Sequence, residues 1–233
     1  MPQEKYFCID IGGSHIKGSI LNHHGDMVEN YIKEPTPKKA TPANILKTIK
    51  KLSSHFTNYT KISVGFPGYV KEGVIITAPN LGTKAWNGTN LSQKISALLK
   101  KPCRVINDAD MQGLGIASGK GLEIVVTLGT GFGTALLHNG ILLPHIELSH
   151  HPIAKDKIYD AYIGEVTLEK IGKAKWNKRI AKVIEVLRIV FNYDHLYLGG
   201  GNAEKISFKL DSNITIVNNQ DGIKGGAKLW EKS

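Results

Sequence analysis

The chain has 233 residues and a mass of 25.5 kDa, and its 30 Lys and Arg residues outnumber its 20 Asp and Glu residues. A mean hydropathy of −0.15 and 41% hydrophobic residues exclude an intrinsically disordered protein and leave enough apolar side chains for a core. Two Cys residues exclude a disulfide framework and a four-thiolate zinc site. We expect a cytoplasmic protein without membrane contact, because no apolar run resembles a signal peptide or a membrane span. The net charge of +10 favours either a polyanionic partner or an ordinary basic surface.

The first half of the chain predicts three strands, a helix, a strand, a helix and a strand. The strands are expected at 6–11, 15–21, 27–32, 61–66 and 104–107. Residues 34–42 contain three Pro residues and are expected to form a loop. Thr41 is expected to cap the first helix, with Pro42 at its first position, and Asn90 to cap the second at 91–100.

The second half repeats this order. Strands are expected at 123–128, 132–138, 141–143, 195–198 and 214–217, and helices at 111–118, 159–171 and 176–191. We therefore expect two α/β lobes around a central cleft, formed by residues 1–108 and 109–220. A last helix at 221–233 is expected to pack back on the first lobe.

The first motif that carries chemistry begins at Asp10, where an apolar strand ends in a carboxylate. Gly12, Gly13 and Ser14 follow as a tight reversal whose N–H groups and hydroxyl suit a phosphate oxygen, with Lys17 adding positive charge. Asp10 is a candidate to hold Mg²⁺ through water. An ordinary glycine hairpin explains the same residues.

A second glycine-rich turn contains Gly129, Thr130 and Gly131 between two strands. It does not match the dinucleotide fingerprint, because a second strand rather than a helix follows, and it lacks the Lys of a Walker loop. The turn offers backbone donors for a phosphate, although a bulged hairpin is the alternative.

Asn107 and Asp108 end a short apolar strand at a strand–helix junction, where α/β sheets commonly bind ligands. A carboxylate at that point suits a general base that accepts a proton from a hydroxyl nucleophile. The alternative is a helix cap, which is our expectation for Asp110.

Residues 145–151 are rich in His and Glu, which suggests a metal site. The spacing is His-x-Glu-x-x-His rather than His-Glu-x-x-His, and the flanking Pro144 and Pro152 leave little room for a helix. We therefore favour a polar site in which Glu147 and His150 bind vicinal hydroxyls.

Gly199, Gly200 and Gly201 follow another apolar strand and precede an expected helix. Glycines at such a point allow a flat ligand or a phosphate to approach the backbone. A flexible loop is an equally good interpretation.

The basic stretch from Lys170 to Arg188 surrounds Trp176. The simpler interpretation is the solvent-facing side of an amphipathic helix. The alternative is a docking surface for a polyanion.

Taken in order, seven motifs resemble the ROK family of sugar kinases and repressors, and within it the polyphosphate-type glucokinases. They are Asp-Ile-Gly-Gly-Ser-His-Ile-Lys-Gly from Asp10, Gly65–Val70, Ala78–Leu81 with Trp86, Asn107–Ala109, Leu128–Ala135, Glu147-Leu-Ser-His150 and Leu198–Asn202. The resemblance implies an actin/hexokinase-like α/β fold with two RNase H-like lobes (the ASKHA architecture). It also implies transfer of a phosphoryl group from ATP or polyphosphate to the 6-hydroxyl of glucose or a related hexose, with Mg²⁺ and commonly as a homodimer.

The same resemblance assigns roles to individual residues. Asp108 corresponds to the general base. The sugar ligands correspond to Asn80, Asn107, Glu147, His150 and Asp160. The phosphate loops correspond to Asp10, Gly12, Gly13, Ser14, Lys17, Gly129, Thr130 and Gly131, and the border of the nucleotide site to Gly199, Gly200 and Gly201.

Three features depart from the family pattern. The zinc-binding Cys cluster is missing, as in polyphosphate-type members, so no structural zinc is expected. Ser149 stands where the family has Gly, and Asp160 stands where it has Glu. Both changes alter the expected sugar pocket.

Two other functions fit parts of the sequence. A sugar-responsive regulator of the same family normally carries an N-terminal helix-turn-helix domain, for which the residues before Asp10 leave no room, so nucleic acid is not an expected partner. A metallohydrolase would use the cluster at 145–151, which lacks a standard metal-binding spacing.

Overall fold

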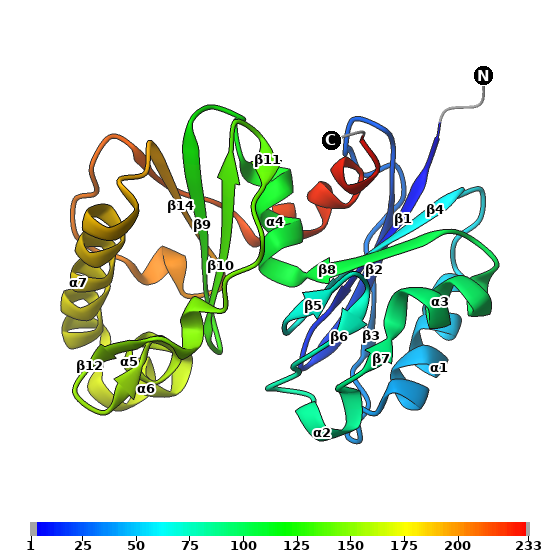
Figure 1. Ribbon diagram of the computed structural model, residues 1–233, viewed down its shortest axis with the longest axis horizontal. Coiled ribbons are helices and arrows are strands. Elements are labelled where there is room, and N and C mark those ends of the chain that lie inside the picture. The colour runs from blue at the N-terminus through cyan, green and yellow to red at the C-terminus, as the bar shows by residue number, and fades with distance from the viewer. Residues whose placement is uncertain (1–3, 232–233) are drawn as a thin grey trace. The chain divides into compact units, whose positions relative to one another are not determined.

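The computed structural model describes residues 4–231, without the side chains of residues 219–222. The described chain divides into two compact units (Figure 1). Residues 4–115 and 222–231 form the first unit, and residues 116–221 form the second.

The first unit is built on a mixed five-stranded sheet of order β3-β2-β1-β4-β8. Strands β1, β4 and β8 are parallel, whereas β2 and β3 pair antiparallel. The strands are β1 (Tyr6–Ile11), β2 (His15–Leu21), β3 (Ile32–Pro35), β4 (Lys61–Phe66) and β8 (Cys103–Asn107).

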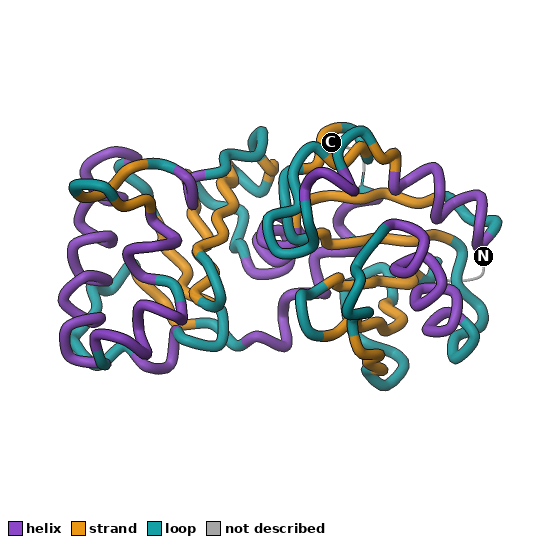
Figure 2. The backbone as a smooth tube through the Cα atoms, turned by 90° about the horizontal axis from the view of Figure 1, so that it is seen from below, coloured by secondary structure: helices purple, strands orange, loops and turns teal. Residues whose placement is uncertain are grey.

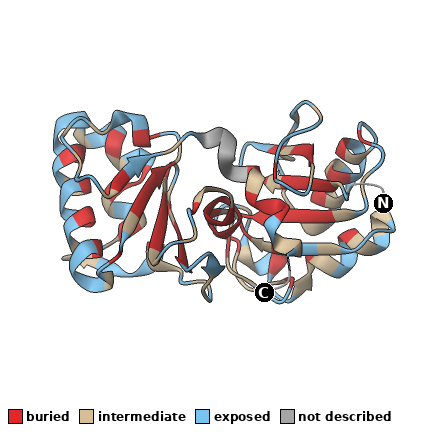
Figure 3. Ribbon diagram, turned by 90° about the horizontal axis from the view of Figure 1, so that it is seen from above, coloured by how far each residue is buried: buried red, intermediate tan, exposed pale blue. Residues whose placement is uncertain are grey.

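Helices cover both faces of this sheet because β1 is buried on both sides. Phe7 and Ile9 belong to the core cluster that includes residues of α1 (Pro42–Ser53) and α3 (Leu91–Leu99). On the opposite face, Tyr6 and Cys8 pack with residues of α4 (Asp108–Ile116) and of the C-terminal 3-10 turns Asn219–Gly226 and Lys228–Trp230. Figure 3 shows buried residues both in the strands and in the helices, and residues 109–114 of α4 are all buried.

A small antiparallel sheet lies between β4 and α3 in the sequence. It contains β5 (Val70–Lys71), β6 (Val74–Ile75) and β7 (Thr89–Asn90), with the short helix α2 (Thr83–Trp86) before β7. The indole of Trp86 is buried, lies 4.8 Å from the Phe66 ring and donates to Ala40 O at 2.8 Å. These contacts attach the small sheet to the core.

The second unit repeats the sheet, with the order β11-β10-β9-β14-β15. Its strands are β9 (Leu122–Leu128), β10 (Phe132–His138), β11 (Ile141–Leu142), β14 (His195–Gly199) and β15 (Ile214–Ile216). As in the first sheet, the first three strands in sequence are antiparallel and the last two extend the sheet in parallel.

The helices of the second unit follow a two-stranded ribbon, β12 (Pro152–Ala154) and β13 (Lys157–Ile158). They are α5 (Tyr159–Ile163), α6 (Glu165–Ile171) and α7 (Lys173–Phe191), with 3-10 turns at Leu148–His150 and Ala203–Lys205. Trp176 of α7 is buried and donates from its indole to Ile163 O at 2.7 Å. Figure 2 shows the helices of this unit to one side of its five-stranded sheet, and the ribbon β12–β13 packs with α5.

The prediction of two similar α/β halves is confirmed by the identical strand orders. The caps at Thr41 and Asn90 are also confirmed, since Thr41 Oγ1 accepts from Asn44 N and Asn90 Oδ1 from Gln93 N.

Three expected elements differ from the structure. The third strand lies at Ile32–Pro35 rather than at 27–32, so part of the expected loop at 34–42 is strand; Pro35 is tolerated because β3 is an edge strand. The helix expected at 159–171 breaks at Gly164. The helix expected at 221–233 consists of 3-10 turns, and residues 232–233 lie outside the described residues.

Candidate functional site

The junction of β8 and α4 presents Asn107 and Asp108, as expected. Asn107 Oδ1 accepts hydrogen bonds from Ala109 N at 2.8 Å and Asp110 N at 3.2 Å, and its Nδ2 donates to Gly68 O at 3.1 Å. Asn107 therefore caps α4, and the prediction that Asp110 is the cap was wrong because the helix begins at Asp108. The cap fixes the backbone that carries the half-buried Asp108.

Two glycines of the Gly65–Val70 motif lie beneath this junction. A Cβ on Gly65 would lie 2.7 Å from Met111 Cε and 3.3 Å from Asp108 Cα. A Cβ on Gly68 would collide with the carbonyl of Thr77. Close packing explains both glycines: Gly65 lies against Met111 and Asp108 at the start of α4, and Gly68 lies against Thr77.

Asn80 lies in an exposed turn of the same unit. Leu81 N donates to Ala78 O at 3.1 Å, and Ala78 N donates to Thr83 Oγ1 at 3.0 Å. These bonds order the turn and leave the Asn80 side chain on its surface.

The first glycine turn connects β1 to β2. Gly12 N donates to His15 O at 2.9 Å, and Thr36 Oγ1 donates to Gly12 O at 2.6 Å. Gly13 has no heavy atom within 4 Å of the position of a Cβ, and both Gly13 and Ser14 are exposed. The turn is thus fixed at its base and open at its tip, as a phosphate loop requires.

Asp10 and Lys17 face each other across β1 and β2 below this turn, with Lys17 Nζ 3.6 Å from Asp10 Oδ2. Burial raises the pKa of the Asp10 carboxyl, and the charge of Lys17 opposes part of the rise. A single carboxylate beside a phosphate loop fits Mg²⁺, which commonly takes one or two carboxylates together with water and substrate phosphate oxygens.

The second glycine turn connects β9 to β10 and has more support from its surroundings. Gly129 N donates to Gly131 O at 3.1 Å, and Gly129 O accepts from Glu165 N at 3.0 Å and Asn202 Nδ2 at 3.2 Å. No heavy atom lies within 4 Å of a Cβ at Gly129. This turn also combines a fixed base with an open position.

Asp160 lies against the second glycine turn. Its Oδ1 accepts from Phe132 N at 2.7 Å and would lie 2.8 Å from a Cβ on Gly131. The aspartate therefore holds the turn, a contact that sequence reasoning missed because Asp160 and Phe132 lie 28 residues apart. Burial raises the pKa of Asp160, although this backbone hydrogen bond lowers it in part.

Glu147 is held by side chains two residues away on either side. Its Oε1 accepts from the Ser149 hydroxyl at 2.6 Å, and its Oε2 lies 3.7 Å from His145 Nε2. The interaction with His145 lowers the pKa of Glu147 most, partial burial opposes the shift, and Ser149 lowers it further. The alternation of His145, Glu147 and Ser149 was the available sequence signal for this trio.

Glu147, His150 and Asp160 form one electrostatic cluster. The pKa of Asp160, which burial raises, is lowered by the charge of His150 and raised by that of Glu147. Among residues 4–231, no group of three or more His, Cys, Asp or Glu side chains is arranged to hold a metal ion. The cluster thus offers hydrogen-bond donors and acceptors of the kind that bind sugar hydroxyls.

Gly199 is the last residue of β14, and Gly200 and Gly201 lead into a single 3-10 turn, Ala203–Lys205, rather than into a regular helix. Gly200 has a φ of +87°, and a Cβ there would collide with the backbone of Leu128. Asn202 N donates to Leu128 O at 2.9 Å. The glycine turn therefore packs directly on the end of β9, next to the second phosphate-loop candidate.

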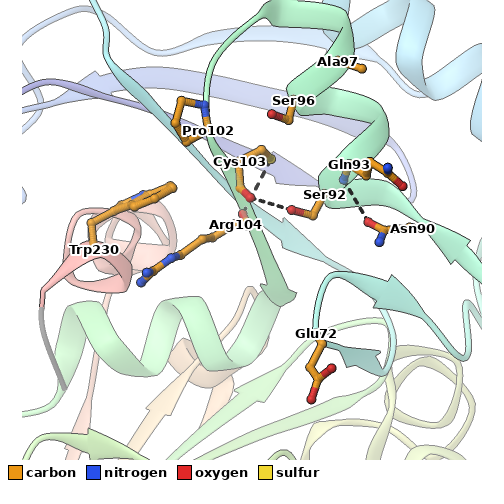
Figure 4. A pocket seen from close by; sticks show the side chains of 10 residues that line it. All are labelled: Glu72, Asn90, Ser92, Gln93, Ser96, Ala97, Pro102, Cys103, Arg104 and Trp230. Carbon is orange, nitrogen blue, oxygen red and sulfur yellow. Dashed lines mark hydrogen bonds between the residues drawn. The ribbon is translucent and has the colours of Figure 1, made fainter.

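A separate polar groove of ≈ 700 Å³ lies in the first unit (Figure 4). Its lining includes Arg104, whose guanidinium carbon lies 4.5 Å from the centroid of the Trp230 ring, and Ser92, which donates to Cys103 O at 2.5 Å. None of the candidate site residues lines the groove.

The candidate residues thus fall into two groups. The first unit holds Asn80, Asn107 and Asp108 together with the first glycine turn, Asp10 and Lys17. The second unit holds Glu147, His150 and Asp160 together with the glycine turns at 129–131 and 199–201. No helix within residues 4–231 is long and apolar enough to cross a membrane.

Two sheets of the same strand order, each with a glycine turn after its first strand, define an actin/hexokinase-like α/β fold. The ROK family model matches residues 6–146. The chain therefore belongs to the ROK family.

Several relatives and solved structures are similar over most of the chain. Polyphosphate glucokinase of Mycobacterium tuberculosis is 34% identical over 94% of this chain and 84% of its own length. The inorganic polyphosphate/ATP-glucomannokinase of Arthrobacter sp. strain KM has a TM-score of 0.88 at 28% identity, covering 97% of this chain and 98% of that one. A ROK family glucokinase from Streptomyces griseus, solved with glucose and AMPPNP, has a TM-score of 0.78 at 18% identity, covering 97% of both chains.

Proposed function

We propose that this protein is a sugar kinase that transfers a phosphoryl group from polyphosphate or ATP to the 6-hydroxyl of glucose or a related hexose. The observation that carries the proposal is the 34% identity to polyphosphate glucokinase over 94% of the chain. The match of the ROK family model to residues 6–146 includes both glycine turns and the β8–α4 junction. The polyphosphate/ATP-glucomannokinase structure supports the same chemistry.

In the proposed reaction, Asp108 accepts the proton of the sugar hydroxyl as its oxygen attacks the terminal phosphorus. The new P–O bond forms to the sugar, and the bond between phosphorus and the bridging oxygen of the donor breaks, leaving a donor shorter by one phosphate. The Asn107 cap supports this role because it fixes the backbone beneath Asp108. Positioning and charge neutralisation supply most of the rate enhancement in phosphoryl transfer.

The sugar hydroxyls are assigned to the side chains of Asn80, Asn107, Glu147, His150 and Asp160. Glu147 suits this role because the interactions with His145 and Ser149 keep its carboxylate ionised and oriented. Asp160 serves the sugar and the second glycine turn together, since one of its oxygens accepts from Phe132 N.

The donor phosphates are assigned to the backbone of Gly12, Gly13 and Ser14, to Lys17, and to Gly129, Thr130 and Gly131. The open space at Gly13 and Gly129 supports this assignment. A nucleotide, when it is the donor, would lie against Gly199, Gly200 and Gly201. Asp10 would hold Mg²⁺ through water, and the bound ion would neutralise charge on the donor phosphates.

The test is a steady-state assay of purified protein with a panel of hexoses and three donors, ATP, GTP and long-chain polyphosphate. We expect glucose or mannose to be phosphorylated with polyphosphate, ATP or both. Absence of transfer from every donor to every hexose, in protein whose folding is verified by circular dichroism, would refute the proposal.

A further inference from the structure

The second unit carries a run of positive charge that the proposed reaction does not use. Residues 116–221 contain 12 Lys and Arg residues against 11 Asp and Glu residues, and six of the 12 cations lie between Lys170 and Lys182 with no acidic residue among them. The next carboxylate along α7, Glu185, pairs with Arg188. The rest of the unit has six cations against 11 carboxylates, so its positive charge is concentrated in this run.

Four of these cations share one face of α7, which we call the basic face. Lys175, Lys178, Arg179 and Lys182 have the spacing i, i+3, i+4, i+7, and the three lysines are exposed. At a rise of about 1.5 Å per residue, the row is roughly 10 Å long. Among the described residues, no ion pair joins these four side chains to a carboxylate.

Tyr162 of α5 organises the end of the basic face. Arg179 Nη1 donates to Tyr162 O at 2.8 Å, and its guanidinium carbon lies 4.6 Å from the centroid of the tyrosine ring. Lys182 Nζ lies 5.9 Å from the same centroid. Two cations are thereby held near one another without a counter-charge, at the cost of their mutual repulsion.

The start of α7 breaks the usual electrostatic rule for helices. Its N-cap is Gly172, with no side-chain cap, and its first turn has no acidic residue although it contains Lys173 and Lys175. The N-terminus of a helix carries partial positive charge, so lysines there are unfavourable and anions are favourable. The helix dipole and the lysines therefore both make the electrostatic potential at the start of α7 positive, and no acidic side chain lies in its first turn to neutralise it.

The basic face is connected through α5 to the second glycine turn. Arg179 binds the carbonyl of Tyr162, whereas Glu165, three residues later, donates to Gly129 O at 3.0 Å. Figure 1 shows α5 and α6 at the N-terminal end of α7. One short segment thus contacts both the glycine turn and the basic face.

We propose that the basic face of α7 is an accessory site for long-chain polyphosphate, binding the part of the polymer beyond the phosphates that react. This inference rests on the proposed function, because it takes the donor to be a polymer. A row of cations matches the repeated negative charge of polyphosphate. ATP and tripolyphosphate have only three phosphates each, which the proposed phosphate loops would already bind. The site raises affinity for long donors and does not take part in the chemical step.

The test compares two triple variants of equal charge change. One carries Lys175→Gln, Lys178→Gln and Lys182→Gln; the control carries Lys47→Gln, Lys50→Gln and Lys94→Gln, at exposed positions of α1 and α3. Arg179 is kept because it bonds to Tyr162. For each protein, the Kd of long-chain polyphosphate, tripolyphosphate and single-stranded RNA is measured by titration, and KM and kcat are measured with each donor.

We expect the α7 triple variant to weaken binding of long-chain polyphosphate roughly tenfold, a factor of about two for each exposed lysine, and to raise its KM similarly. Its kcat, its KM for ATP and its affinity for tripolyphosphate should stay at wild-type values, as should all constants of the control. The difference between wild type and variant should shrink with added salt.

Three results would overturn the inference. They are an unchanged Kd for long-chain polyphosphate in the α7 variant, an equal loss in the control, or tighter binding of RNA than of polyphosphate at the same charge concentration. Failure of the proposed function can be told apart from failure of this inference. If no donor supports phosphoryl transfer, the proposed function fails, but the Kd values from the titrations still show whether the basic face binds long-chain polyphosphate.

Discussion

The two glycine turns occupy the same place in two sheets of the same topology, yet they are supported differently. The turn between β1 and β2 depends on its own strands, on Thr36 and on the Asp10–Lys17 ion pair. The turn between β9 and β10 is bound by Asp160, Glu165 and Asn202, which come from two helices and the loop after β14. Two turns with the same place in the sheet topology therefore need not be equally rigid. The second turn has additional hydrogen bonds from segments outside its sheet.

The comparison also separates chemistry from binding. The carboxylate at the β8–α4 junction of the first unit stands at the start of a helix, whereas Asp160 of the second unit is bonded to the glycine turn. We accordingly expect substitution of Asp108 to act on the chemical step, and substitutions around Asp160 to act on binding and stability.

The largest expected effect is that of Asp108→Asn. Loss of the proposed base should lower kcat by roughly 10²–10⁴-fold without lowering the melting temperature, because the Asn107 cap remains. Asp156→Asn, at an exposed carboxylate, is the control and should retain wild-type kcat. Full turnover by Asp108→Asn would remove the base from the proposal.

Next come two alanine substitutions that compare the turns directly. Gly131→Ala should lower the free energy of unfolding by about 1–3 kcal/mol, because the new Cβ would press on the Asp160 carboxylate. Gly13→Ala should change it by no more than about 0.5 kcal/mol, because the space is open. Urea denaturation measures both values, and equal losses would contradict the difference in support.

Ser149→Ala tests whether the Ser149 hydroxyl lowers the pKa of Glu147. Removing the hydroxyl should raise the pKa of Glu147, so the carboxylate becomes protonated at a higher pH as the pH falls. The acidic limb of kcat/KM for the sugar should move to higher pH, whereas KM for the donor should stay the same. An unshifted pH profile would show that Ser149 does not set the ionisation of Glu147.

Lys17→Met is expected to have only a small effect on stability. The ion pair with Asp10 is partly exposed and should contribute less than about 1 kcal/mol. Its removal should raise the pKa of Asp10 further, because the charge of Lys17 now opposes the effect of burial. Thermal unfolding should therefore change little, whereas KM for the donor should rise; a large loss of stability with unchanged KM would make Lys17 structural.

The sequence predicted the elements whose cause is local. Apolar runs ending in glycines marked β1, β4, β9 and β14, and Thr41 and Asn90 marked two helix starts. The missed features depend on distant partners. Helix α5 ends before Gly164, whose backbone is extended (ψ 168°) and packs so close to Thr130 O that a Cβ would lie 2.7 Å from it. Strand β3 includes Pro35 because it is an edge strand.

The order of the motifs identified the candidate residues, but the sequence did not predict the contacts that hold them in place. The bond from Phe132 N to Asp160 joins residues far apart in the chain, and the capping role of Asn107 depended on where α4 begins. The glycines at 65, 68 and 200 were identified as motif members, and only the structure gives their reason, which is close backbone packing.

Transfer of phosphate to a sugar hydroxyl is tested most directly by ³¹P NMR of the purified protein with glucose, Mg²⁺ and either polyphosphate or ATP. With wild-type protein, the glucose 6-phosphate signal should grow while the signal of the donor's terminal phosphate falls by the same amount. With Asp108→Asn, the glucose 6-phosphate signal should not grow comparably over the same time. Donor consumption without a sugar phosphate, or an equal glucose 6-phosphate signal from the variant, would contradict the proposed reaction.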